Sequence, residues 1–168
     1  GVKSIGARAF ENCSLLSDIK IPSTITEISK NAFIGTPFQN SHSGQYFIIN
    51  DLLIDYHGEE TEICIPEKIR IISNCAFENN QNLISIKIPA SVESIGKFAF
   101  NGCVSLHTLE IPCSVKKIKA YAFSSCSNLS SLYLNDGLEI IEENAFEDCT
   151  FLSSLEIPGS VKAIKESA

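Results

Sequence analysis

Cysteine and histidine are the side chains in this sequence best suited to metal binding or nucleophilic catalysis, and the chain holds seven cysteines and three histidines. A zinc site needs Cys or His ligands paired at short spacing, and neither Cys-x-x-Cys nor His-x-x-x-His occurs. A cysteine nucleophile needs a histidine base beside it, and no spacing relates Cys64, expected on an exposed sheet face, to His42, His57 or His107. We therefore expect no catalytic residue, no metal site and no cofactor, and a protein that is not an enzyme.

Four of the cysteines share one repeated position, three residues after a phenylalanine that recurs along the chain. They are Cys13, Cys103, Cys126 and Cys149. A small apolar side chain at such a position stacks over its counterpart in the next repeat, so we predict that these four lie in the core. Stacking in register points the side chains in parallel, which disfavours the disulfide dihedral, and Cys64, Cys75 and Cys113 occupy three different repeat positions. We therefore predict no disulfides.

Two sequence markers share one period. The dipeptide Ala-Phe ends at residues 10, 33, 77, 100, 123 and 146, at intervals of 23, 44, 23, 23 and 23 residues. The dipeptide Ile-Pro ends at residues 22, 66, 89, 112 and 158, and Leu134-Asn135 fills the one slot that lacks it. We interpret residues 1–168 as a single array of repeats that starts and stops inside a repeat without polar capping units, as expected of a fragment of a longer array.

The unit from Cys103 to Phe123 shows what each repeat builds. Its alternating Leu109-x-Ile111 predicts a short strand buried on one face, and the proline that follows cannot donate to a ladder and ends the pairing. One or two helical turns are expected to carry Phe123 inward. The predicted inward residues are Leu106, Leu109, Ile111, Val115, Ile118, Ala122 and Phe123, with matching residues in the neighbouring units. Because one unit cannot bury its own apolar side chains, the fold class is a stacked β/α repeat solenoid with one parallel sheet along its concave side.

These repeats resemble the BspA-like class of leucine-rich repeats. The resemblance rests on Ile-Pro after the strand and on Ala-Phe-x-x-Cys in register with Leu-x-x-Ile-x-Ile-Pro, over essentially the whole chain. It implies a right-handed leucine-rich-repeat superhelix with a parallel concave sheet and short helical turns. Members of that family are typically large surface or secreted proteins of bacteria and protist parasites, implicated in adhesion. The resemblance therefore implies a cell-surface or secreted location and a protein partner, such as a host matrix or cell-surface protein.

Residues 34–59 are the one irregular part of the array. Two runs rich in Ile, Phe, Tyr and Leu, from Gln45 to Asn50 and from Asp51 to Tyr56, meet at residue types that tolerate left-handed turns, and predict a β-hairpin. The alternative is a degenerate repeat whose first strand joins the main sheet. Inserts on a rigid repeat scaffold are frequent binding elements, but they are also tolerated because they cost little loop entropy, and both interpretations stay open.

A partner would meet the outward side chains of the strands. The candidate binding residues on the concave face are Lys20, Cys64, Lys87, Glu110, Tyr133 and Glu156. Tyr133 is the best single anchor, because an exposed aromatic ring supplies a large contact area with a polar tip. The residue type at this outward position varies between repeats, as expected for a specific contact or for a merely solvated surface. We therefore expect a protein-interaction module of the adhesion type, with a passive spacer that presents another domain as the alternative.

Composition narrows the class of partner. The net charge of −7 and the pI near 4.9 argue against nucleic acid, which requires a basic footprint. No run of 18 or more apolar residues occurs, so we expect no membrane insertion by this segment. Neither the charge nor the repeat period defines an oligomeric state.

Overall fold

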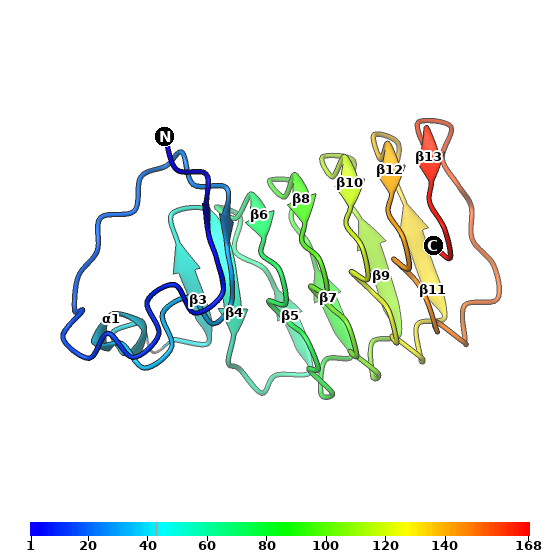
Figure 1. Ribbon diagram of the computed structural model, residues 1–168. Helices are drawn as coiled ribbons and strands as arrows, with labels where there is room; N and C mark the ends of the chain where they lie inside the picture. The colour runs from blue at the N-terminus through cyan, green and yellow to red at the C-terminus, as the bar shows by residue number, and fades with distance from the viewer. Residues whose placement is uncertain (43) are drawn as a thin grey trace.

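In the computed structural model, which describes residues 1–42 and 44–168, the repeats form successive rungs of a parallel β-solenoid (Figure 1). One sheet holds β5 (Glu62–Cys64), β7 (Ser85–Lys87), β9 (Thr108–Ile111) and β11 (Ser131–Leu134). The other holds β3 (Tyr46–Ile49), β4 (Leu52–Tyr56), β6 (Ile71–Ile72), β8 (Ser94–Ile95), β10 (Lys117–Ile118), β12 (Ile140–Ile141) and β13 (Ala163–Ile164). A separate small sheet pairs β1 (Ser4–Ile5) with β2 (Glu27–Ile28), and helix α1 (Pro37–Asn40) follows β2 along the chain.

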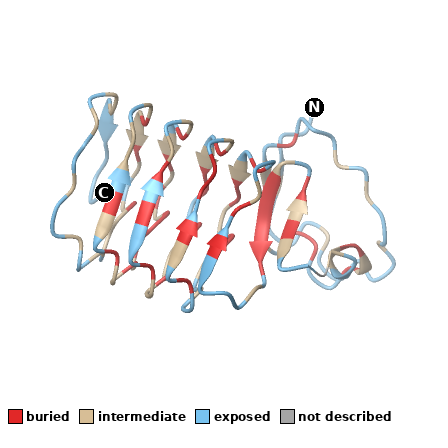
Figure 2. Ribbon diagram, turned by 180° about the vertical axis from the view of Figure 1, so that it is seen from behind, coloured by how far each residue is buried: buried red, intermediate tan, exposed pale blue. Residues whose placement is uncertain are grey.

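The four-stranded sheet lies where the Leu-x-Ile alternation predicts it. In β9, Glu110 is exposed, while Leu109 and Ile111 on either side of it are buried. Figure 2 shows exposed bands on β5, β9 and β11 next to buried ones. All seven predicted inward residues of the Cys103 to Phe123 unit are at most 2% exposed, which confirms the inward assignment for that unit.

The second sheet corrects the expectation of a single sheet. Its strands β6, β8, β10, β12 and β13 are each two residues long and pair in parallel, with Lys117 opposite Ser94 on one side and Ile140 on the other. A strand of two residues is too short to show an alternating pattern. From the residues after each Ile-Pro, the sequence therefore predicted inward side chains but no strand.

The turns that carry the repeated phenylalanines are not helical, which corrects the expectation of short helical turns. The N–H groups of Tyr121, Phe123 and Ser125 all donate to carbonyl groups of the next rung. An α-helix would use those N–H groups for its own carbonyls four residues back. Tyr121 and Ser125 also have positive φ angles of 58° and 60°, in the left-handed region, which no right-handed helix contains. Bonding between rungs thus replaces bonding within a helix.

The irregular segment contains a β-hairpin. Strands β3 and β4 pair antiparallel from Tyr46 opposite Tyr56 to Ile49 opposite Leu52, and Asn50 in the turn has a φ of 55°. Strand β4 also pairs in parallel with β6, so the hairpin extends the seven-stranded sheet. The hairpin therefore joins the solenoid through its second strand, β4, whereas the alternative of a degenerate repeat expected the first strand to join. Strand β4 belongs to the seven-stranded sheet, which the sequence did not predict.

A buried carboxylate links this hairpin to the preceding rung. Asp55 in β4 is 4% exposed, and the Lys30 ammonium lies 3.0 Å from its Oδ1. His57 Nδ1 lies 3.6 Å from the Oδ2 of the same side chain. Burial raises the pKa of Asp55, and the hydrogen bond and charge of Lys30 act against that rise. Lys30 therefore compensates the charge that the hairpin brings into the interior.

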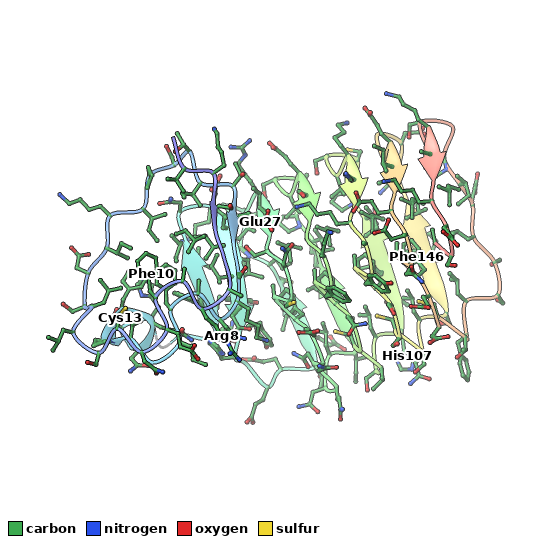
Figure 3. The ribbon with its side chains drawn as sticks, viewed as in Figure 1. Arg8, Phe10, Cys13, Glu27, His107 and Phe146 are labelled. Carbon is green, nitrogen blue, oxygen red and sulfur yellow. The ribbon has the colours of Figure 1, made fainter. Side chains whose placement is uncertain are left out.

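Stacked phenylalanine rings run through the core from rung to rung. The rings of Phe77, Phe100, Phe123 and Phe146 lie parallel within 6°, with centroids 4.8, 5.1 and 5.5 Å apart. These separations match the ~4.8 Å between neighbouring strands, because the backbone ladder sets the spacing of the rungs. Phe10 forms a stacked pair with Phe33 at 5.3 Å in the N-terminal rungs, and Figure 3 shows Phe10 and Phe146 toward opposite ends of the array.

We expect Phe123→Ala to lower the free energy of unfolding by ~3–5 kcal/mol, because the ring is fully buried between two stacked neighbours. The matched control is Phe151→Ala, which removes the same ring from a position that is 64% exposed. Tyr133→Ala on the open sheet face is a second control. Urea titrations of the three variants give the comparison, and equal costs for the buried and exposed rings would contradict the assignment of faces.

Candidate protein-binding face

Neighbouring strands of the four-stranded sheet present a continuous column of outward side chains. Cys64 on β5, Lys87 on β7, Glu110 on β9 and Tyr133 on β11 are all exposed, because each alternates with buried neighbours along its strand. Cys64 pairs directly with Lys87, and Glu110 with Tyr133. We call this surface, together with Glu156 one rung further on, the open face.

Two hollows flank Tyr133 on the open face. The larger hollow, of about 640 Å³, lies between Lys87, Glu110 and Tyr133 on the strands and Pro89 and Pro112 in the following turns. The smaller hollow, of about 480 Å³, lies between Tyr133, Asp136 and Glu156. Tyr133 is 63% exposed and lines both hollows. The ring is therefore a wall between two recesses, accessible from either side.

Asn135 is a functional candidate that sequence reasoning did not select. Its amide nitrogen donates to Glu110 Oε1 at 3.0 Å and to the carbonyl oxygen of Ile111 at 3.1 Å. Asn135 stands where the other regular repeats have the proline of Ile-Pro, and a proline side chain could make neither bond. The replacement of the repeat proline by Asn135 was the signal in the sequence that could have identified this residue, because it occurs in the rung that presents Tyr133.

The two outermost predicted residues lie beyond the sheet. Lys20 and Glu156 are exposed, as predicted, but neither belongs to a strand. Glu156 still borders the smaller hollow beside Tyr133. Lys20 precedes β5, the end strand of the four, and no strand at Lys20 extends that sheet. The structure thus brings together five of the six predicted residues and leaves Lys20 apart.

The ladder cysteines have a structural role that their spacing did not reveal. The thiols of Cys103, Cys126 and Cys149 each donate to the carbonyl of the phenylalanine 26 residues earlier, at 3.2, 3.2 and 3.3 Å. Cys103 and Cys126 are buried and Cys149 is half-buried. Cys13 is exposed, so its prediction as a core residue is wrong: within residues 1–42 and 44–168 no rung covers it and its S–H group donates no hydrogen bond. All seven thiols are free in the structure.

Burial makes the ladder thiols poor nucleophiles. It raises the pKa of Cys103 to about 12 and that of Cys149 to about 11, and it also raises the pKa of Cys126. The exposed Cys64 has no histidine among its hydrogen-bond partners in the described residues; its carbonyl accepts the Tyr46 hydroxyl at 3.1 Å. The histidines make local contacts, as His57 does with Asp55 and His107 with the carbonyl of Ser105.

The described residues contain neither a metal-binding group of side chains nor a membrane-spanning helix. Among residues 1–42 and 44–168, no three His, Cys, Asp or Glu side chains come together in a group that could hold a metal ion. The same part of the chain contains no helix with the length and apolar character needed to cross a bilayer.

The stacked rungs, the parallel sheets and the outward column define a leucine-rich-repeat solenoid. The BspA type leucine rich repeat region matches this sequence over residues 1–50 and 48–168, with six copies, and the chain therefore belongs to that family. Leucine-rich-repeat families are generally protein-interaction modules and typically not enzymes. No curated protein matches the chain.

Solved structures share this fold. A leucine-rich repeat protein of T. pallidum is 27% identical, with a TM-score of 0.69 over 73% of this chain and 62% of its own. A leucine rich cell surface protein from Faecalibacterium prausnitzii is 21% identical, with a TM-score of 0.51 over 99% of this chain and 57% of its own. The chain thus spans less than two thirds of either protein.

We expect alkylation of the native protein at pH 8 to separate the thiols by burial. Cys13, Cys64 and Cys113 are exposed and should react first, whereas Cys103 and Cys126 should react only after denaturation. Because the pKa of Cys103 is raised to about 12, it stays protonated at pH 9, and raising the pH to that value should not unmask it. Peptide mass mapping without reductant reads the pattern, and any bridged pair would contradict it.

Proposed function

We propose that this chain is a protein-interaction module whose contact surface is the part of the open face between Lys87 and Glu156. The observation that carries the proposal is Tyr133, an aromatic side chain that is 63% exposed and forms a wall of two hollows. Aromatic residues that fit pockets of a partner dominate the energetics of protein interfaces. A solvated surface with no partner gains nothing from an exposed ring beside a fixed carboxylate.

The wider context of the proposal is adhesion at a cell surface or outside the cell. Family membership supports it, as does the similarity to the cell surface protein from Faecalibacterium prausnitzii. The partner is then a protein, such as a host matrix or cell-surface protein. The role of the right-handed repeat array is to hold the open face rigid, because each rung is bonded to its neighbours along the whole face.

The hairpin is assigned a secondary role at the rim. A specific interface usually needs about 20 to 30 residues on each side, and the hairpin alone offers too few. The outward side chains of the four-stranded sheet can change without disturbing the core, which leaves them free to match a partner. The passive spacer remains the competing function, and it differs from the proposal in requiring no contact on the open face.

The test is a binding screen of the intact protein against purified matrix and cell-surface proteins, using biolayer interferometry. For any protein bound, Glu110→Lys combined with Tyr133→Ala should weaken binding at least tenfold, with the unfolding midpoint nearly unchanged because neither side chain is buried. The matched control combines Glu143→Lys with Phe151→Ala, which makes the same charge change and removes another exposed ring.

The outcomes separate the functions. Loss of affinity in the first pair of substitutions and not in the control supports contact through the open face. Unaltered affinity would move the contact to residues 34–59, and the absence of any bound protein across the screen would favour the spacer.

A further inference from the structure

The charge of the open face is unbalanced. Glu67 and Glu110 line the larger hollow together with Lys87, and Asp136 and Glu156 line the smaller one. Four carboxylates therefore face a single ammonium group. Among the residues that the structure describes, none of these five side chains forms an ion pair; the ion pairs lie elsewhere on the rungs. Both hollows beside Tyr133 thus carry uncompensated negative charge.

Glu110 is held in place without being neutralised. The Asn135 amide donates to its Oε1, and no hydrogen bond of the described residues reaches its Oε2. An amide partner fixes the orientation of a carboxylate and leaves its charge intact. The free oxygen therefore remains available to a donor from outside the chain, next to the ring of Tyr133 in the paired strand.

We infer that the open face binds an extended, cationic segment of a protein, with an arginine side chain over the ring of Tyr133 and its guanidinium directed to Glu110. This inference rests on the proposed function and specifies the chemistry of the partner. An aromatic face attracts a cation, and arginine also offers the planar fork of donors that a carboxylate accepts. Charge complementarity selects this occupant over an acidic protein, an anionic lipid or a second copy of this chain, whose net charge is −7.

The two hollows predict a spacing in that segment. Glu110 and Glu156 stand two rungs apart, and rungs are separated by ~4.8 Å, so the two carboxylates are about 10 Å apart along the face. An extended segment in the polyproline II conformation advances about 3.1 Å per residue with three residues per turn, so side chains three positions apart lie on the same side, about 9 Å apart. Two basic residues three positions apart therefore meet both carboxylates, one on each side of Tyr133. Lys87 at the other border of the larger hollow repels the segment and directs it toward the Glu156 rung.

A labelled glycine–serine peptide with two arginines three positions apart is the probe, and fluorescence anisotropy with the intact chain measures its affinity. We expect Glu110→Gln, Glu156→Gln and Tyr133→Ala each to weaken binding about fivefold, and Lys87→Ala to strengthen it about twofold. Asn135→Pro restores the repeat consensus and should weaken binding about twofold, because it releases Glu110. Glu143→Gln, an exposed glutamate outside both hollows, should leave the affinity within about twofold.

Several results would overturn the inference. One is equal binding of a peptide in which citrulline, neutral and nearly isosteric, replaces arginine. Another is an equal loss of peptide affinity in Glu143→Gln and Glu110→Gln, which would show that the peptide is attracted by the overall charge of the chain and not by the open face. Binding of phosphatidylserine vesicles, or self-association in sedimentation that Tyr133→Ala abolishes, would assign the face to a different occupant.

The inference and the proposed function fail separately. If the arginine peptide does not bind while a captured protein remains sensitive to Glu110→Lys with Tyr133→Ala, the cationic segment is wrong and the open face stands. If binding of the peptide is weakened by substitutions on the open face while the affinity of every captured protein is unchanged by them, the proposed function is wrong.

Discussion

The main-chain hydrogen bonds between turns of successive rungs are the constraint on which the rest of the structure depends. In the turns of Phe77, Phe100 and Phe123, the phenylalanine and the residues two before and two after it donate to the following rung, as Phe100 does to Ala122 and Gly102 to Ser124. Directing alternate N–H groups to a neighbour requires residues with positive φ, such as Phe98 and Gly102, and excludes a helix. The same bonds hold the rungs at the distance at which phenylalanine rings stack.

A core fixed in this way leaves the outward side chains free to vary. Inward residues repeat because each must meet its counterpart one rung away, whereas Lys87, Glu110 and Tyr133 meet solvent. The fold therefore permits variation among these outward side chains, and the rung of Tyr133 is where we propose that this variation forms a binding site. There the repeat proline is replaced by Asn135, which holds Glu110 from the next rung and keeps it beside the exposed ring.

Sequence periodicity predicted the features that depend on single rungs and missed those that depend on contacts between them. The Leu-x-Ile strands and the buried ladder residues follow from alternation and period alone. The helical turns were wrong because the competing bonds to the next rung leave no pattern in the residues, and the second sheet was missed because its strands are two residues long. Cys13 and Lys20 share the pattern of their counterparts, but within the described residues no rung buries Cys13 and no strand contains Lys20.

Hydrogen–deuterium exchange of individual amides tests most directly whether bonding between rungs organises the fold. The amides of Phe100, Gly102 and Phe123 donate to the next rung, so they should be among the slowest to exchange and should exchange together, through opening of the stack. The amides of Ser153 and Ser154 donate no main-chain hydrogen bond within the described part of the chain and should exchange fast. Exchange of Phe100 and Phe123 at the rate of Ser153 would contradict the account.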